Sequence, residues 1–176
     1  MKRRFKNGTL RLKSWNYSNP GFYFITFSTF NKIPYFGEVR NGKMIYSGMG
    51  KIAVKYWNYI PRQFPFIKLD VFQIMPDHIH VVIYMQETNH ISTKGYGGVT
   101  GSKNPMGKGT TGEIIRWYKG RVTFEINKRF PESSFYWQSR YYDHIIRNNV
   151  SLNRIRKYIK NNPKNYHRKE ILLVRD

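Results

Sequence analysis

Four segments of the chain are rich in apolar, aromatic and β-branched residues and are short, which is typical of β-strands. The first is rich in aromatic and β-branched residues, GFYFITFSTF. The second and third are separated by Pro76-Asp77, a pair that favours a turn. The fourth contains the sequence YYDHIIR. The predicted strands lie within residues 21–30, 67–75, 78–85 and 135–147.

Apolar residues recur instead at helical spacing in three segments. These predicted helices cover residues 50–64, 112–130 and 149–166. The first should end near Pro61, because proline interrupts helical hydrogen bonding. The last should begin at Asn149 or Ser151 and stop before Pro163.

The predicted elements alternate in the order β-α-β-β-α-β-α. The first six form the split β-α-β pattern of a ferredoxin-like fold, an α+β architecture with an antiparallel sheet. The seventh is an added C-terminal helix. We expect one domain over residues 1–176. A small hairpin is inserted near residues 35–48, where Asn41-Gly42 separates two short alternating runs.

Residues 92–112 differ from the rest of the chain in composition. Their sequence, STKGYGGVTGSKNPMGKGTTG, holds half of the chain's 14 glycines and no acidic residue. We expect a mobile basic loop.

The charge balance indicates a polyanionic partner. Lys and Arg number 31 against 10 Asp and Glu, which gives a net charge of +21. A compact protein with this excess repels itself unless a polyanion neutralises it, and nucleic acid is the first candidate. The 14 tyrosines favour nucleic acid over a membrane surface, because aromatic rings stack on exposed bases. No secretory signal or membrane-spanning run is expected.

Two histidines stand one residue apart in an otherwise apolar strand, within MPDHIHVV. Residues i and i+2 of a strand share a face, so His78 and His80 project together, whereas Asp77 should face the other way. Two imidazoles on one face can bind one divalent metal. A single histidine in a strand is more often a core residue. Cysteine is absent, so a third ligand must be an oxygen or nitrogen donor.

The last helix offers such a donor. Tyr158 and Asn162 are four residues apart and therefore neighbours beside the apolar stripe of Leu152, Ile155 and Ile159. If this helix packs on the histidine face, Asn162 can supply a carbonyl oxygen and Tyr158 a hydroxyl. The alternative for Tyr158 is a tyrosine at the edge of the core with its hydroxyl in water.

These motifs resemble a known family. MPDHIHVV is similar to the His-hydrophobic-His (HUH) motif of single-tyrosine transposases, and YYDHIIRN followed by YIKNNP resembles the C-terminal part of the REP-associated tyrosine transposases. The resemblance implies that Tyr158 is the nucleophile and that His78, His80 and Asn162 hold Mg²⁺ or Mn²⁺. It also implies cleavage and rejoining of single-stranded DNA through a 5′-phosphotyrosine, beside a hairpin.

Other residues are candidates for supporting roles. Asp143 or His144 could help Tyr158 to lose its proton, although strand alternation lets only one of them face the site. The alternative is that neither assists, with one at the edge of the core and the other on the surface. Arg140, Arg147 and Arg154 are candidate contacts to DNA phosphates.

Two alternatives explain part of the pattern. A non-catalytic module that binds single-stranded DNA or RNA accounts for the charge and tyrosines, but not for two histidines on one strand face. A replication initiator or relaxase shares the chemistry but usually carries more domains. We expect a monomer or homodimer that binds DNA and no membrane, in the bacterial cytoplasm with the nucleoid.

Overall fold

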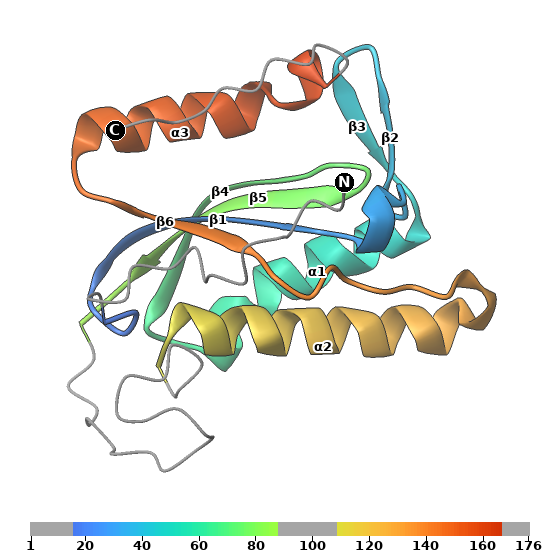
Figure 1. Cartoon of the computed structure of the whole chain (residues 1–176), viewed down its shortest axis with the longest axis horizontal. Coiled ribbons are helices and arrows are strands. Elements are labelled where there is room, and N and C mark those ends of the chain that lie inside the picture. Colours follow the sequence, from blue (N-terminus) through green and yellow to red (C-terminus); the bar gives the residue numbers. More distant parts are fainter. Residues whose placement is uncertain (1–15, 88–108, 167–176) are drawn as a thin grey trace, which may run out of the picture.

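A four-stranded antiparallel sheet forms the centre of the protein (Figure 1). The structure is a computed structural model that describes residues 16–87 and 109–166. The strands run in the order β4-β5-β1-β6. This is the strand order of a ferredoxin-like fold, so the α+β prediction is confirmed. The strands are β1 (Gly21–Ser28), β4 (Ile67–Ile74), β5 (His78–Met85) and β6 (Tyr142–Ile146).

Helices cover both faces of the sheet (Figure 1). Helices α1 (Gly48–Gln63) and α2 (Thr111–Arg129) lie on one face, and α3 (Asn149–Asn161) lies on the other. Successive strand residues therefore enter different cores: Val81 packs with α1 and α2, and Val82 packs with α3. This explains why β5 is apolar on both sides.

The α3 face has its own small core. Leu152, Ile155 and Ile159 from α3 are buried against Phe24 of β1 and Val82 of β5. An ion pair fixes the helix further: Arg156 Nε donates to Asp70 Oδ1 at 2.9 Å, and Nη2 contacts Oδ2 of the same carboxylate. The side chain of Asn148, the residue before the helix, accepts a hydrogen bond from the Ser151 amide at 2.8 Å. Asn148, and not Asn149 or Ser151, is thus the N-cap.

A two-stranded hairpin extends from one end of the sheet. Its strands are β2 (Gly37–Arg40) and β3 (Lys43–Tyr46), joined at Asn41 and Gly42 with φ angles of 50° and 69°. Both angles are left-handed, as a two-residue hairpin turn requires. A Cβ on Gly42 would lie 3.3 Å from Lys164 Cγ, in the 3₁₀ turn η3 (Pro163–Asn165), so the hairpin reaches the end of α3.

Some predicted boundaries were wrong. Helix α1 continues past Pro61 to Gln63, because the Phe64 amide still bonds to the Ile60 carbonyl at 2.8 Å. The fourth strand is shorter than predicted: β6 starts at Tyr142, and earlier in that segment only Trp137 forms an isolated bridge, with Thr29.

The glycine-rich segment is described only in part. Most of it lies outside the described residues, and Thr111 and Gly112 already belong to α2. No helix in the part of the chain that the structure describes is long and apolar enough to cross a membrane.

Packing of α3 generates a stability prediction. Ile155 is 1% exposed, so Ile155→Ala should lower the free energy of unfolding by about 2–5 kcal/mol, through lost burial and the cavity left behind. Val150, on the same helix, is 71% exposed, and Val150→Ala should change it by less than about 0.5 kcal/mol. Urea denaturation followed by circular dichroism measures both. Equal stability of the two variants would contradict the packing described.

Candidate active site

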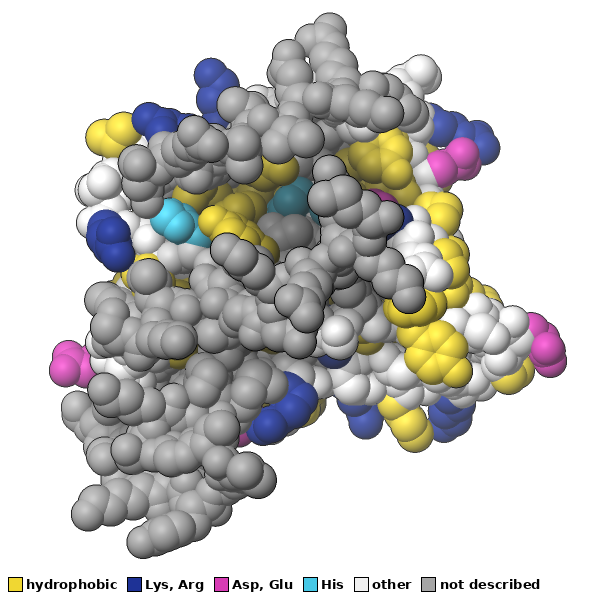
Figure 2. All heavy atoms as spheres, viewed as in Figure 1, with side chains coloured by type: hydrophobic (Ala, Val, Ile, Leu, Met, Phe, Trp, Pro, Cys, Tyr) yellow, Lys and Arg dark blue, Asp and Glu magenta, His cyan; other side chains and the backbone are white. Residues whose placement is uncertain are grey.

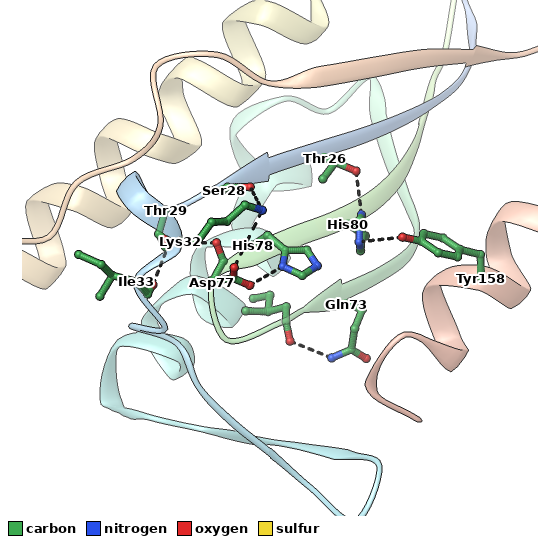
Figure 3. A network of polar contacts seen from close by, with 11 residues as sticks. Thr26, Ser28, Thr29, Lys32, Ile33, Gln73, Asp77, His78, His80 and Tyr158 are labelled. Atoms are coloured by element: carbon green, nitrogen blue, oxygen red, sulfur yellow. Dashed lines mark hydrogen bonds and ion pairs between the residues drawn. The ribbon is translucent and has the colours of Figure 1, made fainter. Parts of the chain in front are cut away.

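The two histidines lie side by side on the sheet face that α3 covers (Figure 3). In the register of β5 with β1, Ser28 is opposite His78 and Thr26 is opposite His80. The imidazole ring centroids are 4.7 Å apart. The strand therefore presents two ring nitrogens to one region, as the i, i+2 spacing predicts.

His80 is enclosed by three side chains. Its Nδ1 is 2.7 Å from Thr26 Oγ1, its Nε2 is 3.3 Å from the Tyr158 hydroxyl, and its ring stacks on Phe24 at 5.8 Å between centroids. The residue is 6% exposed. Burial lowers the pKa of His80 well below its ordinary value, and the charges of His78 and Lys32 lower it further. His80 is consequently a neutral imidazole near pH 7, the form that can bind a metal.

His78 contacts Asp77, the residue before it. The distance from His78 Nδ1 to Asp77 Oδ1 is 2.5 Å. The prediction that Asp77 faces away was wrong, because Asp77 lies in the turn before β5 and strand alternation does not apply there. Burial would raise the pKa of Asp77, but the hydrogen bond and charge of His78 and the charge of Lys32 outweigh it, and the pKa is lowered. Asp77 is therefore an ionised partner for His78.

Tyr158 reaches the histidines from α3 (Figure 3). Its ring meets Phe24 edge-on at 6.3 Å and lies 5.2 Å from the His80 ring, between centroids. Asn162 follows directly after α3 and keeps helical angles, so it lies about one turn beyond Tyr158. Within the described residues, no hydrogen bond joins the Asn162 side chain to either histidine. The structure thus brings Tyr158 to His80 and leaves Asn162 near the end of the same helix.

The two candidate helpers of Tyr158 lie on opposite faces of β6. His144 pairs with Phe24 and shares the histidine face, whereas Asp143 pairs with Ile25, whose side chain belongs to the α1/α2 core. Direct help from Asp143 is therefore excluded by strand alternation. The candidate DNA contacts Arg140, Arg147 and Arg154 are all exposed.

Two residues beside His80 were not predicted from the sequence. Thr26 on β1 and Gln73 on β4 flank it in the strand register. Gln73 Nε2 donates to the Ile74 carbonyl at 2.9 Å and lies 3.4 Å from the Tyr46 hydroxyl. Thr26 and Gln73 are recognised as neighbours of His80 only once the pairing of β1 and β4 with β5 is known.

The donor set fits a divalent metal. Thr26 and Asp77 occupy the two Nδ1 atoms, so Nε2 of each histidine is the available donor; such outer partners typically orient metal-binding imidazoles. Groups of three or more His, Cys, Asp and Glu that could hold a metal are absent from residues 16–87 and 109–166. A third ligand would thus be an amide, a hydroxyl or the substrate. Nε2 of His80 has one lone pair and binds either a metal or the Tyr158 proton.

Comparison with known proteins places the chain in a family. A protein of Haemophilus influenzae, itself described as uncharacterized, is 37% identical over 158 residues, which cover 88% of this chain and 87% of the relative. The model of the IS200-like transposases matches residues 107–162. The chain belongs to the IS200-like transposase family. The matched residues include Tyr158 and Asn162, and the histidines lie outside them.

A solved structure shares the transposase fold. A REP-associated tyrosine transposase bound to a REP hairpin superposes with a TM-score of 0.58 at 17% identity, covering 84% of this chain and 68% of that one. This similarity agrees with the strand order described above. On the face drawn in Figure 2, the Lys and Arg side chains of the described residues are scattered and do not gather in one patch.

The burial of His80 generates a prediction about its titration. An exposed histidine is half protonated at a pH of about 6.5. In metal-free buffer the buried His80 imidazole should still be neutral at that pH and should gain its proton only at a lower pH. As pH falls below about 6.5, the unfolded chain takes up a proton that native His80 does not, so this residue makes the fold less stable in acid. Nuclear magnetic resonance of the histidine rings, assigned with His80→Gln, measures the midpoint. A midpoint at or above 6.5 would contradict the described burial.

Proposed function

We propose that this chain cleaves and rejoins single-stranded DNA through a covalent bond between Tyr158 and a 5′-phosphate. The observation that carries the proposal is the 3.3 Å contact between the Tyr158 hydroxyl and Nε2 of His80, with His78 beside it. The proposed nucleophile thus lies beside a neutral imidazole, with a second imidazole next to it on the same sheet face. Membership of a transposase family makes DNA the substrate this arrangement would act on.

His78, His80 and Asn162 are the residues proposed to hold Mg²⁺ or Mn²⁺. When bound, the metal supplies a Lewis acid that polarises the scissile phosphate and orients it. Imidazole ligands favour Mn²⁺ over Mg²⁺, which prefers oxygen. Asn162 would contribute a neutral carbonyl oxygen from the turn after Tyr158. Thr26 and Asp77 would keep the two rings oriented through their Nδ1 atoms.

The covalent step exchanges one phosphodiester for another. The Tyr158 oxygen attacks phosphorus, the bond to the 3′-oxygen breaks, and the products are a 5′-phosphotyrosine and a free 3′-OH. Tyr158 loses one proton and the leaving 3′-oxygen gains one, so the net charge does not change. Because one phosphodiester bond replaces another, no high-energy cofactor is needed. A different 3′-OH can then reverse the step and join a new end. His144, on the same sheet face, is the candidate that can approach Tyr158.

The proposed substrate is single-stranded DNA next to a hairpin. The +21 charge suits a polyanion, and a solved protein of this fold is bound to a REP hairpin. The exposed Arg140, Arg147 and Arg154 are available to phosphates near the site.

The geometry argues against a purely non-catalytic binding sheet. Such modules stack bases on aromatic rings of an open sheet face. Here α3 covers the histidine face, and Phe24 beside His80 is only 5% exposed. A row of bases cannot stack on a sheet face that a helix covers in this way.

Covalent capture tests the proposal. The protein is incubated with labelled oligonucleotides in which a random single-stranded segment flanks a hairpin, with Mn²⁺ or with chelator. A denaturing gel separates covalent adducts, and sequencing of the captured DNA identifies the cleavage position. Failure to form any metal-dependent adduct would reject the proposed function. Subsequent transfer to a second 3′-end distinguishes a transposase from an enzyme that only nicks.

Tyr158→Phe should abolish the covalent adduct and leave DNA binding within about twofold. The change removes the attacking oxygen and keeps the ring that packs against Phe24. Gel capture measures the adduct, and fluorescence anisotropy measures binding. Tyr136→Phe is the matched control, because Tyr136 is 61% exposed on the segment between α2 and β6. An adduct in the Tyr158 variant would mean that another tyrosine is the nucleophile.

Removal of the proposed metal ligands should have graded effects. His78→Ala and His80→Ala should each abolish cleavage, as chelation should in the unmodified protein. Asn162→Ala should cleave slowly and recover with raised Mn²⁺, because mass action refills a weakened site; Asn162→Gln should retain more activity, since it keeps a carbonyl oxygen. Calorimetric Mn²⁺ titration and the adduct assay measure these effects. Cleavage that resists chelator, or unaltered Mn²⁺ affinity in both histidine variants, would reject the metal site.

A further inference from the structure

A strained turn holds a lysine at the edge of the histidine site. In the 3₁₀ turn η1 (Phe30–Lys32), Asn31 and Lys32 have left-handed φ angles of 50° and 58°. Asparagine tolerates this conformation, but lysine does so only at a cost of about 1–3 kcal/mol. Such a conformation persists only where its surroundings enforce it.

Contacts with the β4–β5 turn enforce it here (Figure 3). The fully buried Thr29 donates its amide to the Asp77 carbonyl at 2.9 Å. Its hydroxyl lies 2.8 Å from the Ile33 carbonyl and 2.9 Å from the Asp77 carbonyl. The next amide, of Phe30, donates to the Tyr136 carbonyl at 2.9 Å. The turn is thereby fixed to the segment that leads into His78.

This turn directs the Lys32 ammonium toward the site. Lys32 Nζ donates to Ser28 Oγ at 3.0 Å and lies 3.9 Å from Asp77 Oδ2, while the other oxygen of that carboxylate contacts His78. Ser28 is opposite His78 in the strand register. The Lys32 side chain is 60% exposed, so the ammonium has one side on Ser28 and Asp77 and the other open to an incoming ligand.

The contact with Asp77 leaves the Lys32 ammonium able to bind a further anion. At 3.9 Å the ion pair is long and exposed, and such pairs contribute only about 0–1 kcal/mol. The one carboxylate of Asp77 contacts both Lys32 and His78, so Lys32 together with a bound divalent metal would carry more positive charge than Asp77 neutralises, which suits an anion.

We propose that Lys32 binds a non-bridging oxygen of the scissile phosphate beside His78. This inference rests on the function proposed above and adds to it a residue that contacts the reacting group. The ammonium is fixed in place before DNA arrives, and it would stabilise the negative charge that develops as Tyr158 attacks. Lys32 transfers no proton and forms no bond in this role.

The experiment compares Lys32→Met and Lys32→Arg with the control Lys128→Met. Lys128 is an exposed lysine on α2, on the other side of the sheet, and its substitution removes the same charge. With the captured oligonucleotide at saturation, Lys32→Met should slow adduct formation by about 100-fold, and Lys32→Arg should recover part of the rate. Lys128→Met should stay within about twofold. The Mn²⁺ midpoint should not shift to a higher concentration, as it would if Lys32 only positioned Asp77 and His78.

A binding measurement without chemistry completes the test. In the Tyr158→Phe background with chelator, the oligonucleotide is compared with one carrying a neutral methylphosphonate at the identified cleavage position. That replacement should weaken binding to protein that retains Lys32 and should not change binding to the Lys32→Met variant. Equal losses in both backgrounds, or a normal adduct rate in Lys32→Met, would overturn the role of Lys32 alone. Absence of adduct in the unmodified protein would instead overturn the proposed function.

Discussion

The packing of α3 on the sheet is the interaction on which the candidate site depends. Ile155 and Ile159 are buried against Phe24 and Val82, and that contact sets Tyr158 against His80. Neither the strand nor the helix contains a site by itself. Because the apolar stripe of α3 and Tyr158 are on one helix, hydrophobic burial holds the proposed nucleophile in position. Hydrophobic packing between α3 and the sheet has no preferred direction, and the Arg156–Asp70 ion pair adds a contact that does.

The histidines show how burial and polar partners are combined. An apolar environment keeps His80 neutral, and Thr26 and Asp77 fix the two rings through Nδ1. Each ring therefore presents Nε2 in a defined direction before any ligand arrives, which reduces the reorganisation needed when charge develops in a reaction. Lys32, held by a strained turn, extends the same arrangement to the edge of the site. The larger core on the α1/α2 face supports the strands, so the α3 face can accommodate buried polar groups, which cost stability unless they are hydrogen-bonded.

The sequence by itself determined the order of elements, the ferredoxin-like fold and the shared face of His78 and His80. These follow from short-range periodicity, since strand alternation and helical spacing are properties of neighbouring residues. It also determined that Tyr158 and Asn162 are adjacent on one helix. Pro61 and the Asn148 cap were misjudged, because a terminal turn depends on individual hydrogen bonds that propensity does not resolve.

Only the tertiary structure decided which residues meet across the chain. The register of β1, β4 and β5 placed Thr26 and Gln73 beside His80, and the register of β6 separated His144 from Asp143. The turn geometry brought Asp77 back to His78, against the expectation from alternation. Lys32 reaches the site through a left-handed turn that no local pattern indicates. Such contacts depend on how distant segments of the chain pack against each other. Periodicity relates only neighbouring residues and therefore carries no information about this packing.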